Sequence, residues 1–96
     1  MVYTINSINI TYDPKKCQAN IDARGVSFDR VVELDWTNAI IRPDERKDYG
    51  EVRLRVFGLL DGRLHVAVVT PRKEGLRVIS FRKANEKEKK YYAETR

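Results

Sequence analysis

Four arginines and the single histidine stand at alternate positions of three strand-like segments. They are Arg53, Arg55, Arg63, His65 and Arg77. An arginine side chain presents a planar fork of donors that matches two oxygens of a phosphate. If the segments pair with these side chains on one sheet face, that face would bind phosphate groups. The alternative is that strand arginines pair with carboxylates on a neighbouring strand, but no acidic set alternates along these segments.

The sequence lacks the motifs of other common kinds of catalysis. There is no glycine-rich phosphate loop and no carboxylate pair with the spacing of a glycosidase or a two-metal enzyme. Ser27, Ser80 and Cys17 have no base close by in the sequence. One cysteine and one histidine cannot anchor a zinc cluster, so we expect no metal and no cofactor.

Cleavage of RNA needs no more than the residues present, because the 2′-hydroxyl of the RNA can itself attack the adjacent phosphate. The protein then holds the chain in line and stabilises the anionic transition state with arginines and lysines. His65 is the only histidine, and histidine is the usual proton-transfer residue near neutral pH. A lone strand histidine is more often structural, and a tyrosine is the rival for this role.

The positive charge is concentrated at the end of the chain. Residues 1–71 hold 10 basic and 10 acidic side chains, whereas residues 72–96 hold 9 basic and 4 acidic ones, which accounts for the net charge of +5. A local basic excess attracts polyanions, most commonly nucleic acid. The alternative is a solvated, lysine-rich terminal helix.

The length of 96 residues predicts one domain spanning residues 1–96. A composition of 42% hydrophobic and 34% charged residues is typical of a folded chain. No run approaches the roughly 18 apolar residues of a membrane span, and the start lacks the features of a signal peptide. We therefore expect no membrane association and a cytoplasmic location.

The first half of the chain predicts a strand and two helices. Alternating apolar residues indicate a strand within 2–12, and Asp13 and Gly25 are typical start and stop signals for a helix over 14–24. Ser27 can cap a short helix over 28–34. Residues 39–41 are a candidate short strand, and the charged stretch 43–48 is predicted as a loop.

The second half predicts strands over 51–60, 63–70 and 75–81, and a helix over 83–94. Asp61-Gly62 is a strong signal for a two-residue hairpin. Each strand has one aliphatic face, and we expect these faces to coincide under the N-terminal helices: Val52, Leu54 and Val56; Leu64, Val66 and Val68; Leu76 and Val78. The fold expected is α+β, an antiparallel sheet of about four strands with two N-terminal helices and a C-terminal helix.

A series of short motifs runs along the chain in a fixed order: Tyr12-Asp13-Pro14-Lys15, Asn20, Gly25-Val26-Ser27-Phe28, Gly50-Glu51-Val52-Arg53, Phe57-Gly58, Gly62-Arg63-Leu64, Val68-Val69-Thr70 and residues 77–85. Together they resemble the BrnT toxins, small bacterial toxins of type II toxin–antitoxin pairs. The resemblance spans about residues 8–92. Its most specific part is the closing spacing Ser80, Arg82, Ala84, Glu88, Tyr92.

The resemblance implies a RelE-like fold and metal-independent ribonuclease activity. It implies a BrnA-type antitoxin with a ribbon-helix-helix part, and an assembly that binds operator DNA as the toxin–antitoxin complex. Such antitoxins dimerise, so we expect a heterotetramer of two toxins and two antitoxins. One departure is Arg24, which stands where the family usually has a histidine. A guanidinium stays protonated, so Arg24 can hold a phosphate but cannot act as a base.

The basic residues and the candidates for proton transfer together form a predicted set of site residues. The residues that we expect to bind the scissile region of RNA are Arg53, Arg77, Arg82 and Lys83. Further contacts with RNA are expected from Arg24, Arg55 and Arg63. Arg82 has an alternative role as a helix-start charge paired with Glu86. Tyr92 and His65 are the rivals for proton transfer, with Tyr91 expected to pack. A non-enzymatic nucleic-acid-binding or interaction module remains the alternative function.

Overall fold

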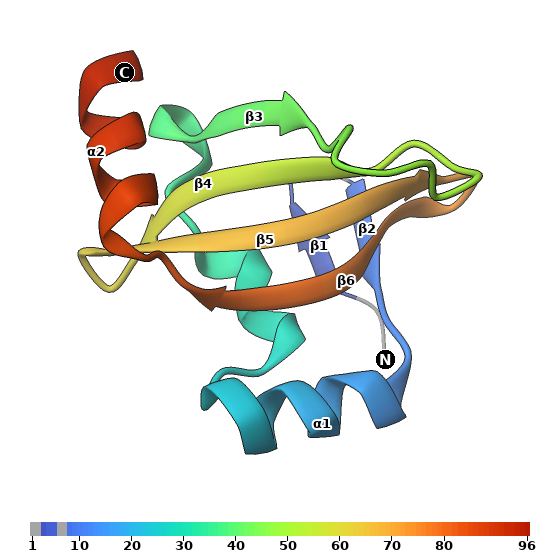
Figure 1. Ribbon diagram of the computed structural model, residues 1–96. Helices are drawn as coiled ribbons and strands as arrows, with labels where there is room; N and C mark the ends of the chain where they lie inside the picture. The colour runs from blue at the N-terminus through green and yellow to red at the C-terminus, as the bar shows by residue number, and fades with distance from the viewer. Residues whose placement is uncertain (1–2, 6–7) are drawn as a thin grey trace.

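The computed structural model describes residues 3–5 and 8–96 and gives them an α+β fold (Figure 1). Three helical segments connect the first two strands to the rest, and one helix closes the chain. The elements in chain order are β1 (Tyr3–Ile5), β2 (Ile8–Thr11), α1 (Pro14–Arg24), the 3-10 helices η1 (Phe28–Glu33) and η2 (Trp36–Asn38), β3 (Ile40–Pro43), β4 (Leu54–Leu60), β5 (Arg63–Arg72), β6 (Gly75–Lys83) and α2 (Glu86–Thr95).

The strands lie side by side in the order β1-β2-β6-β5-β4-β3. Neighbours are antiparallel except β2 and β6, which are parallel. The prediction of about four antiparallel strands is therefore wrong, because the described residues form a six-stranded mixed sheet. The last strand inserts beside β2, and no local signal predicts a pairing between segments so far apart in the chain. Residues 2, 6 and 7 of the single strand predicted over 2–12 lie outside the described residues, and the candidate strand at 39–41 corresponds to β3, which begins at Ile40.

The predicted signals at the two ends of α1 act as expected, whereas Ser27 makes no capping hydrogen bond and the helix expected over 28–34 is the 3-10 helix η1. Asp13 accepts a hydrogen bond from the Lys15 amide at 2.9 Å at the start of α1, and Gly25 ends the helix in the left-handed region at φ 76°. Helix α2 begins three residues later than predicted, because β6 continues to Lys83. Asn85 then caps α2 in a capping box with Glu88.

The predicted alignment of aliphatic faces is wrong for β4 and β5. The two-residue turn Asp61-Gly62 pairs Leu60 with Arg63, so every even residue of β4 faces an odd residue of β5. Leu54 and Val56 therefore share a face with Val69 and Ala67, and Arg55 shares the other face with Val68. Arg55 thus lies on the opposite face from Arg63 and His65, so the single basic face expected from the sequence does not form.

A register shift in the β5–β6 pairing changes the faces again. Val68 pairs with Ser80 and Val69 with Val78, which leaves Ile79 as an extra residue in β6. Val78 and Phe81 consequently both reach the same core, although alternation predicted opposite faces for them. A bulge of one residue reverses the side-chain pattern of everything beyond it.

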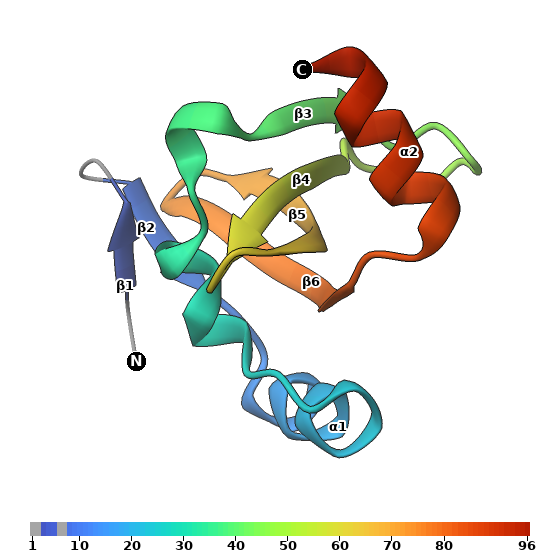
Figure 2. The same ribbon diagram turned by 90° about the vertical axis from the view of Figure 1, so that its left-hand side faces the viewer.

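The two faces of the sheet are covered by different helices. Segments α1 and η1 pack on one face, with Cys17, Phe28 and Val31 against Val56, Val69 and Phe81. On the other face α2 contributes Tyr92 to a smaller cluster with Ile40, Phe57, Leu64 and Val66. Figures 1 and 2 show α1 below β6 and α2 beside the β3–β4 part of the sheet. The molecule therefore has a helix-covered face and a half-open face beside α2.

Candidate functional site

A cleft of about 670 Å³ opens on the face that carries α2, between that helix and strands β3 and β4. We call it the α2 cleft. Its charged lining consists of four cations and two carboxylates, and Phe57 and Tyr91 supply the aromatic surface. The cations are Arg42, Arg46, Arg55 and Lys87, and the carboxylates are Glu45 and Glu88. The excess of cations makes the cleft suited to an anion.

Arg55 is a cation of the α2 cleft whose buried donor has no partner. Strand β4 places it opposite Val68, and its guanidinium lies 5.6 Å from the centre of the Phe57 ring. Its Nε is buried and has no hydrogen-bond partner. A buried donor without a partner costs free energy, which a ligand oxygen can recover. Arg55 is therefore placed to bind an anion in the cleft.

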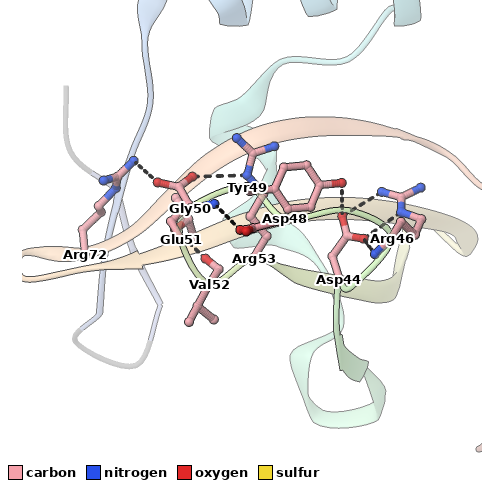
Figure 3. A network of polar contacts seen from close by, with 10 residues as sticks. Asp44, Arg46, Asp48, Tyr49, Gly50, Glu51, Val52, Arg53 and Arg72 are labelled. Atoms are coloured by element: carbon pink, nitrogen blue, oxygen red, sulfur yellow. Dashed lines mark hydrogen bonds and ion pairs between the residues drawn. The ribbon is translucent and has the colours of Figure 1, made fainter.

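Arg46 is held at the α2 cleft by a buried carboxylate. Its Nε donates to Oδ1 of Asp44 at 2.7 Å and its terminal nitrogen donates to Oδ2 at 2.8 Å, while the phenol of Tyr49 donates to the same carboxylate at 3.2 Å (Figure 3). The hydrogen bonds from Arg46 lower the pKa of Asp44 to about 2. The pair fixes the direction of the Arg46 guanidinium, which is itself exposed at the cleft.

Arg82 forms a two-bond ion pair with Glu88 across the junction of β6 and α2. Both bonds measure 2.8 Å, and a third hydrogen bond of 3.3 Å runs from Arg82 to the carbonyl of Lys83. Hydrogen bonding by Arg82 lowers the pKa of Glu88, and the same contact raises the pKa of Arg82. Arg82 is therefore paired, as the alternative reading of the sequence expected, but its partner is Glu88. The carboxylate of Glu86 pairs instead with Lys89.

The two tyrosines of α2 exchange the places expected from the sequence. Tyr92 is buried, with 5% of its surface exposed, and its phenol donates to the carbonyl of Asn38 at 2.9 Å. Tyr91 lies at the wall of the α2 cleft, with its ring 5.2 Å from that of Phe57. Tyr92 is therefore the tyrosine that packs against the sheet and Tyr91 the one that lines the α2 cleft, and the assignment of proton transfer to Tyr92 stays a prediction.

Three other predicted residues gather on the opposite face of the sheet. His65, Arg63 and Lys83 line a pocket of about 210 Å³ next to Gly25 and Asp61, which we call the His65 pocket. Arg24 is exposed at the end of α1, directly before Gly25. These residues are thus near one another but on the other side of the sheet from Arg55 and Tyr91.

Arg53 and Arg77 join neither group. Arg53 precedes β4, stacks on the Tyr49 ring at 4.1 Å and pairs with Glu51 at 3.2 Å, and Glu51 also pairs with Arg72 at 3.2 Å (Figure 3). Arg77 lies near the start of β6, between Thr70 of β5 and Thr11 of β2. The nine predicted residues therefore separate into distinct regions.

The sequence reasoning missed three cations of the α2 cleft, namely Arg42, Arg46 and Lys87. It assigned residues 43–48 to a loop because they lack periodicity. The available signal was Asp44 two residues before Arg46, a spacing at which an aspartate can hold nearby donors in a turn. Among the described residues, no three His, Cys, Asp or Glu side chains cluster as metal ligands do. No described helix has the length and apolar character needed to cross a membrane.

A family model matches residues 12–88, and its description is ribonuclease toxin, BrnT, of type II toxin–antitoxin system. The chain belongs to the BrnT family. The match covers most of the chain and includes every strand from β3 to β6. Comparison with curated protein sequences gives no match. Membership of the BrnT family implies a ribonuclease activity, an RNA substrate and an antitoxin partner.

Proposed function

We propose that this BrnT protein is a metal-independent endoribonuclease that cleaves RNA in the α2 cleft by attack of the RNA 2′-hydroxyl. The observation that carries this proposal is the unpartnered, buried Nε of Arg55, a residue that lines a cleft with more cations than carboxylates. A phosphodiester supplies the acceptor oxygens that such donors bind. The RelE-like architecture suggested by the sequence resemblance belongs to the same proposal.

The positions of the cleft side chains suggest how each would act in RNA cleavage. Arg55 and Arg46 bind the nonbridging oxygens of the scissile phosphate, where negative charge increases as the 2′-oxygen attacks. The new bond joins the 2′-oxygen to phosphorus, and the bond from phosphorus to the 5′-oxygen breaks. The 2′-hydroxyl loses a proton and the departing 5′-oxygen gains one. The products are a 2′,3′-cyclic phosphate and a 5′-hydroxyl.

Tyr91 is the group of the α2 cleft that we assign to proton transfer or to stacking on a base. Tyr92, favoured by the sequence, positions α2 through its bond to Asn38. Arg82 keeps Glu88 and the first turn of α2 in place beside the cleft. Arg53 and Arg77 are candidates for contacts with RNA beyond the cleft.

The partner proposed is a BrnA-type antitoxin with a ribbon-helix-helix part, in a complex of two toxins and two antitoxins in the cytoplasm. An acidic segment of the antitoxin would cover Arg42, Arg46 and Lys87, three exposed cations that attract negative charge. Operator DNA would be bound by the complex and not by the toxin alone. Co-purification with the product of the neighbouring gene, followed by mass measurement of the complex, tests the partner and its stoichiometry.

Cleavage of a defined RNA tests the activity. We expect Arg55→Gln to reduce the rate by about 100-fold, the effect typical of removing one donor to a transition-state oxyanion. A 2′-O-methyl group at the scissile nucleotide should abolish cleavage, and EDTA should not change it. Lys87→Gln should slow cleavage, whereas Lys73→Gln, an exposed lysine in the β5–β6 turn, should not.

Two results would oppose the proposal. Cleavage that continues on 2′-O-methyl RNA, or that stops with EDTA, would contradict the mechanism. RNA binding that weakens in Lys87→Gln without any cleavage by the unaltered protein would favour the non-enzymatic binding module.

A further inference from the structure

The His65 pocket lies on the α1-covered face and takes no part in the α2 cleft. Its lining combines a buried imidazole with cations and with apolar surface from Val26 and Leu60. The volume of about 210 Å³ is large enough for a phosphate group together with part of a sugar. The His65 pocket is therefore a second candidate binding site, separate from the α2 cleft.

His65 is oriented by a hydrogen bond that leaves one ring nitrogen unused. Only 4% of the residue is exposed, its ring packs 5.4 Å from that of Phe81, and Nδ1 lies 2.9 Å from the carbonyl oxygen of Arg63. A carbonyl only accepts, so this contact requires the proton on Nδ1. Nε2 makes no hydrogen bond with any described residue, and in this tautomer it is an acceptor that a ligand hydroxyl can use.

Two cations of the pocket are also without acidic partners. Arg63 and Lys83 are exposed, and neither forms an ion pair within the described part of the chain. Register pairs Lys83 with His65, so their side chains share a face. The one carboxylate of the lining, Asp61, is bound by Arg30 at 2.7 Å. The local excess is therefore positive.

We propose that the His65 pocket binds a phosphate group held by Arg63 and Lys83, with Nε2 of His65 accepting a hydrogen bond from a hydroxyl of the phosphate or of an attached ribose. A guanidinium and an ammonium supply the donors that a phosphate requires, and Nε2 of the buried imidazole supplies an acceptor for a hydroxyl of the ligand. The apolar walls can accept the ribose attached to that phosphate. The α2 cleft opens on the opposite face of the sheet, so the residues that bind a phosphate there do not contribute to this pocket.

The phosphate can come from a second position along the RNA or from a free mononucleotide. Arg82 and Lys83 are consecutive in β6 and so point to opposite faces, and β2 pairs with β6 only at Leu76 and Arg77. A single-stranded RNA that passes the connection between β6 and α2 can therefore reach both the α2 cleft and the His65 pocket. The inference that the phosphate belongs to RNA rests on the proposed ribonuclease function, whereas the inference that the pocket binds phosphate does not.

Chemical-shift titration of the full chain tests the pocket without any cleavage assay. Inorganic phosphate should produce saturable shifts of the His65 ring and of the Gly25 and Val26 amides. Arg63→Gln and Lys83→Gln should each weaken this binding by about 5-fold or more, the effect of losing one charged hydrogen bond. Lys73→Gln is the matched control, since it removes the same charge from the far turn and should leave the affinity unchanged.

Two further titrations separate the sources of the phosphate. A non-cleavable 2′-O-methyl RNA should bind more tightly than phosphate and shift both the pocket and Tyr91 if RNA is the ligand. A uridine monophosphate that binds more tightly than the RNA, with Tyr91 unshifted, would identify a mononucleotide site. Absence of saturable shifts at His65, or equal binding by the Arg63 and Lys83 variants, would overturn the proposal whatever the outcome of RNA cleavage.

Discussion

Glu88 holds the side chain of Arg82 with two hydrogen bonds of 2.8 Å while it also closes the capping box of α2 by accepting from the Asn85 amide at 2.9 Å. One carboxylate thus joins the end of β6 to the first turn of α2. Because Glu88 also lines the α2 cleft, the junction determines where α2 and Tyr91 stand relative to Arg55. Stability and the geometry of the cleft are therefore linked through a single residue.

Replacement of Glu88 tests this link. Glu88→Gln should lower the free energy of unfolding by about 1–3 kcal/mol, because the hydrogen bonds it makes to a charged partner are partly shielded from water. Glu86→Gln is the control, since its side chain is 91% exposed and should change stability by less than about 0.5 kcal/mol. Urea unfolding measures both. Equal losses in the two variants would show that the Arg82 contact contributes nothing specific.

The Asp44–Arg46 pair predicts a dependence of stability on acid. Arg46 lowers the pKa of Asp44 to about 2 in the folded protein, below its ordinary value of 3.8. A depressed carboxyl pKa contributes stability above the ordinary value and loses it as pH falls through the folded value. The contribution should therefore decline between about pH 4 and pH 2. Unfolding of Asp44→Asn should show a weaker decline in that range, and an unchanged decline would contradict the assignment.

Variants of the two α2 tyrosines should affect different properties, one the rate of RNA cleavage and the other the stability of the fold. Tyr91→Phe should slow RNA cleavage by about 10-fold or more if the phenol moves a proton, with little change in unfolding. Tyr92→Phe should cost about 1 kcal/mol, because the Asn38 carbonyl loses its partner, and should change cleavage little. Single-turnover cleavage and thermal unfolding measure the two effects. The reverse pattern would return the catalytic role to Tyr92.

Asn20 replaces a neighbouring strand at the edge of β6. Its carboxamide donates to the carbonyl oxygens of Phe81 at 2.7 Å and Val26 at 2.9 Å, and its oxygen lies 3.4 Å from the Phe81 amide. Asn20→Ala should destabilise the fold by about 1–3 kcal/mol, since it leaves partly buried backbone groups unpaired. Gln18→Ala, on an exposed part of α1, is the control. Calorimetric unfolding that is the same in both variants would refute this role.

Much of the local structure is readable from the chain alone. Asp13, Gly25 and the Asp61-Gly62 turn act through backbone geometry over a few residues, so their effects do not depend on the rest of the fold. The motif order likewise indicated the BrnT family that the family model matches. The pairing of β4 with β5 was also available, because a two-residue turn dictates which residues are opposed.

The composition of the α2 cleft depends on tertiary contacts instead. The extra residue in β6 turns Phe81 toward the α1 face, and a shift of one residue exchanges the faces of a strand whose side chains alternate. Arg46 reaches the cleft because Asp44 is buried under Tyr49, in a stretch with no periodic pattern. Tyr91 lines the cleft because Tyr92 takes the inward position on α2, where its phenol donates to the Asn38 carbonyl. Local patterns specify elements, whereas register, bulges and partly buried ion pairs specify which side chains meet.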